Sequence, residues 1–83
     1  MAKFQTACKA KLVAKYNNRQ DAHLITTKDV YVVWSCCILG NFKALLSTNV
    51  PGDGVYVEYT YNKETGELYE DFYTKESNTC YLK

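Results

Sequence analysis

The spacing of the apolar residues changes near residue 29, and this change constrains the fold more than any other feature of the sequence. Before that point, four apolar or aromatic residues recur at every fourth position: Phe4, Cys8, Leu12 and Tyr16. This spacing is typical of one face of an α-helix. After it come short runs rich in Val, Tyr, Ile and Trp, several of them alternating with polar residues, as in β-strands. One helix followed by an antiparallel meander predicts an α+β fold of two layers.

We predict the helix over residues 3–18, where alanines favour helix and Asn17-Asn18 favours its end. Three basic residues, Lys11, Lys15 and Arg19, also recur at every fourth position and form a stripe beside the apolar one. We predict a single domain over residues 1–83, with the sheet at about residues 30–75 and a short strand or tail after it. A 16-residue helix is too small to cover a four-stranded sheet, so we expect that the chain can associate as a homodimer.

The first hairpin is predicted to turn at Gly40-Asn41, which places Leu39 opposite Phe42. Both of its faces are largely apolar, a pattern typical of a central strand or of one covered on both sides. The second hairpin is predicted to turn at residues 63–66, with Tyr61 opposite Leu68 and Val57 opposite Phe72. That face should meet the helix.

Net charge is only +1, but the charges are unevenly distributed along the chain. Residues 1–20 contain five basic residues and no acidic one, whereas residues 51–83 contain seven acidic and three basic residues. The two ends can complement each other within the fold or across a dimer. Alternatively, the basic end offers a surface for nucleic acid, or the acidic end one for a basic partner.

A search for chemistry finds no catalytic motif, so we expect a protein that is not an enzyme and needs no cofactor. The one histidine, His23, lies in a connector, and the four cysteines lack the spacing of a metal site. We expect these thiols, at Cys8, Cys36, Cys37 and Cys80, to be buried and reduced. The absence of a long apolar run or a signal-peptide pattern favours the cytosol and no membrane.

Aromatic residues give the most informative candidate surface. The face of the second hairpin that points away from the helix carries five candidate partner-binding residues: Tyr56, Glu58, Tyr69, Asp71 and Tyr73. Tyrosine among carboxylates suits a basic protein surface and repels phosphates. The alternative is nucleic-acid binding by the basic residues Lys11, Lys15, Arg19 and Lys43. Trp34 beside Lys43 could stack on a base, but core packing is the favoured interpretation of Trp34.

The strand region resembles a known family. The residues concerned are Val30–Cys36, Asn41, Lys43–Thr48, Tyr56, Glu58, Thr60–Asn62, Glu67, Tyr69, Asp71, Tyr73 and Lys75. This pattern, over about residues 29–75, resembles a family of very small phage- or prophage-encoded proteins of unknown function. The chain departs from it at Cys37-Ile38 and at residues 51–54, and the helix does not match.

The resemblance implies a context rather than a set of site residues, because the family has no established ones. It implies action in the cytoplasm of an infected bacterium. Small phage proteins without catalytic motifs often bind a host or phage protein and block it, as anti-restriction and anti-CRISPR proteins do. We therefore expect an inhibitor of bacterial defence or a modulator of host machinery. The alternatives are a nucleic-acid-binding accessory protein of phage replication or recombination, and a virion component.

Overall fold

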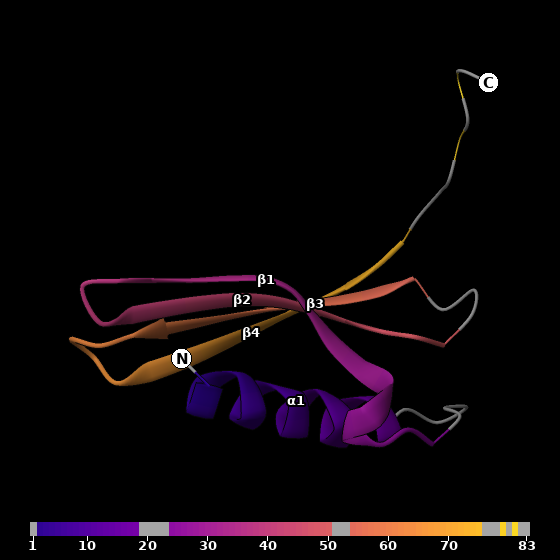
Figure 1. Cartoon of the computed structure of the whole chain (residues 1–83), viewed down its shortest axis with the longest axis horizontal. Helices are drawn as coiled ribbons and strands as arrows, with labels where there is room; N and C mark the ends of the chain where they lie inside the picture. The colour runs from indigo at the N-terminus through magenta and orange to yellow at the C-terminus, as the bar shows by residue number, and fades with distance from the viewer. Residues whose placement is uncertain (1, 19–23, 51–53, 76–78, 80, 82–83) are drawn as a thin grey trace.

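In the computed structural model, one helix packs against one face of a four-stranded antiparallel sheet (Figure 1). The structure describes residues 2–18, 24–50, 54–75, 79 and 81. Its elements are α1 (Ala2–Asn17), a short 3-10 helix η1 (Thr27–Asp29), and strands β1 (Val30–Ile38), β2 (Asn41–Thr48), β3 (Val55–Asn62) and β4 (Glu67–Thr74). The strands lie in sequence order in the sheet. The predicted α+β meander is therefore confirmed.

Helix α1 is the predicted helix, displaced by one residue at each end. Its buried residues are Cys8, Leu12 and Tyr16, and Phe4 stacks on Phe42 of β2 with the ring centroids 5.1 Å apart. The fourfold spacing thus identified the packed face correctly. At the end of the helix, the Asn17 side-chain amide donates to the Ile25 carbonyl and accepts from the Ile25 N–H, each at 2.9 Å. These two hydrogen bonds hold the buried Ile25 against the end of the helix.

The second hairpin has the predicted register. Tyr61 pairs with Leu68, and Val57 pairs with Phe72. The turn between them contains Gly66 at φ 72°, a conformation that glycine adopts without steric cost. Val55, Val57 and Tyr59 of β3 are almost fully buried and form the centre of the core, as predicted for the face that meets the helix.

The first hairpin corrects the predicted turn. The turn residues are Leu39 and Gly40, at φ 52° and 81°, so Ile38 pairs with Asn41 and Cys37 pairs with Phe42. Two successive positive φ values define a type I′ turn, whose twist matches that of the strands. Glycine takes the second central position, and Asn41 begins β2 instead of completing the turn.

A β-bulge at Val33 is a second departure from the prediction. Val32 pairs with Leu46 and Trp34 with Leu45, so Val33 is the extra residue. Because a bulge shifts the alternation by one position, Val30 and Val32 lie on the helix side while Tyr31 moves to the opposite side. Val32 packs against the core, and Tyr31 is exposed.

Strand β1 is an edge strand, which contradicts its expected central or doubly covered position. Helix α1 contacts β1 and β2 on one face (Figure 1). No other described element lies over the opposite face, which we call the open face. The apolar composition of β1 therefore reflects exposed side chains rather than burial on both sides: Val33, Trp34 and Ile38 are all exposed.

Candidate functional site

The open face contains three cross-strand rows that run through all four strands. From β1 to β4, the first holds Tyr31, Ser47, Tyr56 and Tyr73; the second Trp34, Leu45, Glu58 and Asp71; the third Cys36, Lys43, Thr60 and Tyr69. The rows follow from antiparallel pairing, because directly paired residues point to the same side of the sheet. The face thus brings aromatic, acidic and apolar side chains into one continuous surface.

All five predicted partner-binding residues lie together on this face. We call Tyr56, Glu58, Tyr69, Asp71 and Tyr73 the acidic tyrosine patch. Its tyrosines are substantially exposed, at 37%, 52% and 53% for Tyr56, Tyr69 and Tyr73. Tyr56 pairs with Tyr73 and Glu58 pairs with Asp71 across β3 and β4. The sequence therefore located the patch correctly, and its role in binding stays a prediction.

The charge of the open face is mostly negative. Carboxylates of Glu58, Glu67 and Asp71 are on this side of the sheet, together with the amine of Lys43. The Lys43 Nζ lies 3.5 Å from a Glu58 carboxylate oxygen. Hydrogen bonding to the Glu67 carboxylate raises the pKa of Tyr69, as does the negative charge of Glu67. This tyrosine therefore remains a neutral O–H group at physiological pH.

Sequence reasoning missed two aromatic residues of this face and misplaced two cysteines. Trp34 is 44% exposed beside the half-buried Leu45, so its interpretation as a core residue is wrong. Tyr31 reaches the open face through the bulge at Val33. The expectation of buried thiols holds for Cys8 but is wrong for Cys36 and Cys37, which are exposed, and Cys80 lies outside the described residues. The strand order of a meander leaves the first strand at an edge of the sheet, and this is the signal that would have predicted the exposure of Trp34.

The residues of the nucleic-acid alternative do not form one surface. Lys11 and Lys15 project from exposed positions of α1, whereas Lys43 lies on the open face, on the far side of the sheet. Arg19 lies outside the described residues. The structure therefore separates Lys43 from the helical lysines.

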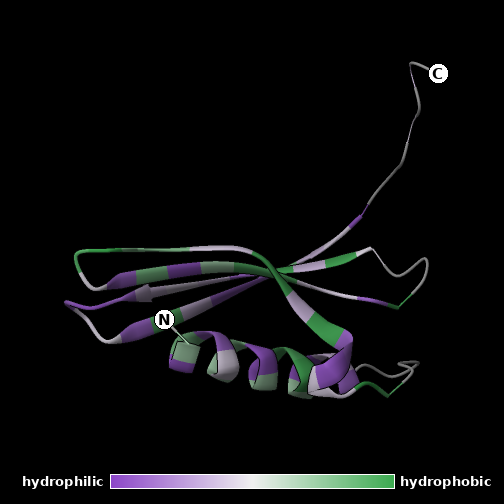
Figure 2. Cartoon of the chain, in the orientation of Figure 1, coloured by the Kyte–Doolittle hydropathy of each residue, from purple (hydrophilic) through white to green (hydrophobic). Residues whose placement is uncertain are grey.

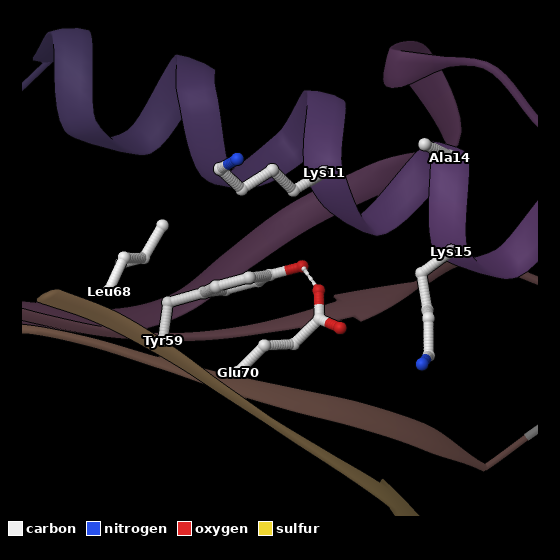
Figure 3. A pocket seen from close by; sticks show the side chains of 6 residues that line it. All are labelled: Lys11, Ala14, Lys15, Tyr59, Leu68 and Glu70. Atoms are coloured by element: carbon white, nitrogen blue, oxygen red, sulfur yellow. Dashed lines mark hydrogen bonds between the residues drawn. The ribbon is translucent and has the colours of Figure 1, made fainter.

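On the helix side of the sheet, a groove lies between α1 and strands β3 and β4 (Figure 3). It has a volume of about 430 Å³ and is lined by Lys11, Ala14, Lys15, Tyr59, Leu68 and Glu70. The Tyr59 hydroxyl donates to a Glu70 carboxylate oxygen at 2.6 Å. Burial, and then Glu70, raise the pKa of Tyr59 far above its ordinary value, so the phenol keeps its proton. The hydroxyl of Tyr59 and the carboxylate of Glu70, the two polar groups on the sheet side of the groove, are thus hydrogen-bonded to each other.

Cysteine, histidine and carboxylate side chains can also hold metal ions. Within the described part of the chain, no three of these side chains are grouped closely enough to do so.

Burial raises the pKa of the Cys8 thiol to about 11, with Lys11 lowering and Glu70 raising it to smaller extents. Cys8 is therefore a protonated thiol inside the core. None of the described helices is both long enough and apolar enough to cross a bilayer.

The fold and its surfaces define a small α+β domain with one open aromatic sheet face. Comparison with known families then identifies the group: residues 5–83 match a family of unknown function, DUF6275, and the chain belongs to it. The match includes most of α1, whereas the resemblance seen in the sequence covered only about residues 29–75. No match was found among curated proteins or among solved structures.

Proposed function

We propose that the protein is a non-enzymatic binding protein whose acidic tyrosine patch docks on a cationic surface of another protein. The observation that carries this proposal is the grouping of three exposed tyrosines with Glu58 and Asp71 on a face that no described element covers. Tyrosine supplies a large contact area at a low cost in conformational entropy, because it has few rotatable bonds. Interfaces are enriched in such residues.

The charges of the face support a partner rich in arginine or lysine. Three carboxylates share the open face with Lys43, whose charge is balanced by Glu58 at 3.5 Å. An arginine of the partner could stack on a tyrosine ring and pair with Asp71 at the same time. Phosphates of a nucleic acid would meet repulsion from the same carboxylates.

The phage resemblance supports a biological setting for this binding. We place the partner in the cytoplasm of an infected bacterium, as a host or phage protein. Docking would block that protein, and inhibition of a bacterial defence system is the outcome that we propose. What supports this finer statement is the resemblance alone, so it needs its own test by identification of the partner.

The first experiment is a pull-down from bacterial lysate with the tagged protein, with and without nuclease, followed by mass spectrometry. We expect a stoichiometric protein partner that survives nuclease and is released by salt, because charge pairs are screened. The Tyr69→Ala/Tyr73→Ala variant should recover at least about tenfold less partner, the effect of losing about 1.4 kcal/mol.

Two variants serve as matched controls. Tyr81→Ala removes a tyrosine that is 89% exposed but lies outside the sheet, and Glu64→Gln removes an exposed carboxylate from the β3–β4 turn. Both should recover the partner as the wild type does, whereas Glu58→Gln/Asp71→Asn should not. Equal recovery by the patch variants and the controls would contradict the proposal, and recovery only without nuclease would point to nucleic acid.

A further inference from the structure

The two edges of the sheet differ in how they are protected against pairing with another strand. Edge strands present unpaired backbone N–H and C=O groups, and proteins commonly protect them with charged side chains. Strand β4 has three such residues, Glu67, Glu70 and Asp71. Strand β1, with the sequence VYVVWSCCI, has no charged residue in nine positions. Figure 2 shows the contrast, since the ribbon of β1 is green or pale while β4 includes purple segments.

The unprotected edge also exposes apolar side chains. Trp34 is 44% exposed and Ile38 is 66% exposed, and both lie on the open face, one and five positions after the bulge residue Val33. Large exposed apolar groups on an edge strand are a recognised site of association. The bulge at Val33 interrupts the regular edge, which leaves residues 34–38 as the regular stretch available for pairing.

The turn fixes which backbone groups of this stretch point outward. In a two-residue hairpin, the residues that flank the turn, here Ile38 and Asn41, form a hydrogen-bonded pair. Hydrogen-bonded and non-hydrogen-bonded pairs then alternate along the ladder. Ser35 and Cys37 therefore direct their N–H and C=O groups away from β2. Among the described residues, the backbone hydrogen bonds outside the regular elements involve no residue of β1.

We infer that the occupant of this edge is a second copy of the chain, paired antiparallel through residues 34–38 about a two-fold axis. A two-fold interface brings the same surface of both copies together, so like charges on it repel. Strand β1 can pair with itself without such repulsion, whereas β4 would bring its acidic residues together. Stacking of the open faces would likewise oppose two sets of carboxylates. The uncharged edge is thus the surface suited to self-pairing, and the inference is independent of the proposed function.

The alternation also sets the register. Pairing all five residues of the segment places the axis at Cys36, with Ser35 of each copy opposite Cys37 of the other. These two residues have outward backbone groups, so they form the hydrogen-bonded pairs that an antiparallel ladder requires. Trp34 then lies beside Ile38 of the second copy on the open face. The two four-stranded sheets join into one continuous sheet, with both acidic tyrosine patches on the same side.

Cys36 provides a direct test, because this register places it opposite itself in a non-hydrogen-bonded pair. Such pairs have a Cα–Cα distance of about 4.5 Å, within the range that a disulfide spans. Diamide would accept the two electrons and two protons of the thiols. Two variants, each with one exposed strand thiol, are compared: Cys37→Ser/Cys80→Ser retains Cys36, and Cys36→Ser/Cys80→Ser retains Cys37. Both thiols are exposed, but only Cys36 faces its own copy.

We expect the Cys36 variant to form a covalent dimer at least about tenfold faster than the Cys37 variant, because pairing raises the effective concentration of the facing thiols. Equal rates, or no covalent dimer in either variant, would overturn the proposed register. Sedimentation velocity of the reduced wild type over a concentration series should show twice the mass of one chain. A single-chain mass throughout the series would overturn self-pairing altogether.

Charged substitutions separate edge pairing from other modes of association. Trp34→Lys and Ile38→Lys each put a charge into the Trp34–Ile38 contact between the two copies, where it faces an apolar side chain. Each variant should shift the sedimenting species to the single chain. Ile38 is the more exposed of the two, so this variant keeps the test available if Trp34→Lys impairs folding. The matched control, Tyr69→Lys on β4, should remain a dimer. Dissociation caused by Tyr69→Lys but not by the β1 variants would instead favour association through the open faces.

Discussion

The two faces of the sheet are built from similar residues but have opposite roles. Tyr59 is fully buried on the helix side, whereas Tyr56 of the same strand and its partner Tyr73 on β4 are exposed on the open side. Val57 is buried and Val33 is exposed. Residue type therefore does not decide which side chains form the core of this small domain. A side chain belongs to the core when its position in the strand faces the helix, and turns and bulges determine which alternate positions do so, that is, the phase of the strand.

The largest expected effect is the difference in stability between a variant of the helix side and a variant of the open side. Leu12→Ala opens a cavity in the fully buried helix side and should lower the free energy of unfolding by about 2–5 kcal/mol. Tyr73→Ala on the open side should lower it by about 1 kcal/mol or less, since only cross-strand contacts are lost. Urea unfolding followed by circular dichroism measures both. Similar losses in the two variants would mean that the open face is part of the core.

A pH series sharpens the comparison through Cys8, the buried thiol on the helix side. Its folded-state pKa of about 11 exceeds the ordinary value of 9.0, so the folded protein holds this proton more tightly than the unfolded chain does. The associated stability is complete below pH 9 and is lost as pH rises toward 11, by about 2–3 kcal/mol in total. In Cys8→Ala this part of the decline should be absent. Parallel profiles for the wild type and the variant would contradict the burial of this thiol.

The turn that sets the phase of the first hairpin gives a smaller effect with the opposite sign. Leu39 adopts φ 52° although its side chain is 89% exposed, so the left-handed conformation is not compensated by burial. Asparagine tolerates this conformation better, and Leu39→Asn should raise the free energy of unfolding by about 0.5–1 kcal/mol. Thermal unfolding measures the gain. Leu24→Asn, at another exposed leucine outside the strands, is the control and should show no such increase.

The smallest effect concerns the ion pair on the open face. Lys43→Met should lower stability by about 0.5 kcal/mol or less, because the Lys43 side chain is 42% exposed and solvent weakens its attraction to Glu58. The difference should vanish in high salt. A double-mutant cycle with Glu58→Gln isolates the pairwise energy. A coupling well above this value would show that the open face is shielded from water, as it would be in association through the open faces rather than through the edge of β1.

The sequence was sufficient for the elements that follow one uninterrupted pattern. The fourfold spacing identified the buried face of α1, and the clean alternation around the Gly66 turn predicted the β3–β4 register and the grouping of Tyr56, Tyr69 and Tyr73. The β1–β2 hairpin was harder, because Leu39-Gly40 and Gly40-Asn41 both contain a turn-forming glycine. The choice between them depends on the pairing of whole strands rather than on the turn itself.

The bulge at Val33 has no local signal, since Val32 and Val33 are chemically identical and either could be the extra residue. Its presence is decided by packing: Val32 meets the core, while Tyr31 and Trp34 reach the open face. This is why the sequence did not place these two aromatic residues in the candidate surface. Exposure of Trp34 also depends on the position of β1 at the edge, which the strand order supplies and local composition does not.

The same bulge determines where this chain can tolerate a change in length. Val32 and Trp34 lie on opposite sides of the sheet, as consecutive residues of a regular strand do, so a chain without Val33 would keep every side chain of β1 on its present side. Removing a residue between Trp34 and Ile38 would instead reverse the orientation of every position before the deletion, up to the bulge. Deletion of Val33 would thus leave the buried and the exposed side chains of β1 on their present sides. A deletion in the adjacent stretch of the strand would instead move side chains from one side of the sheet to the other.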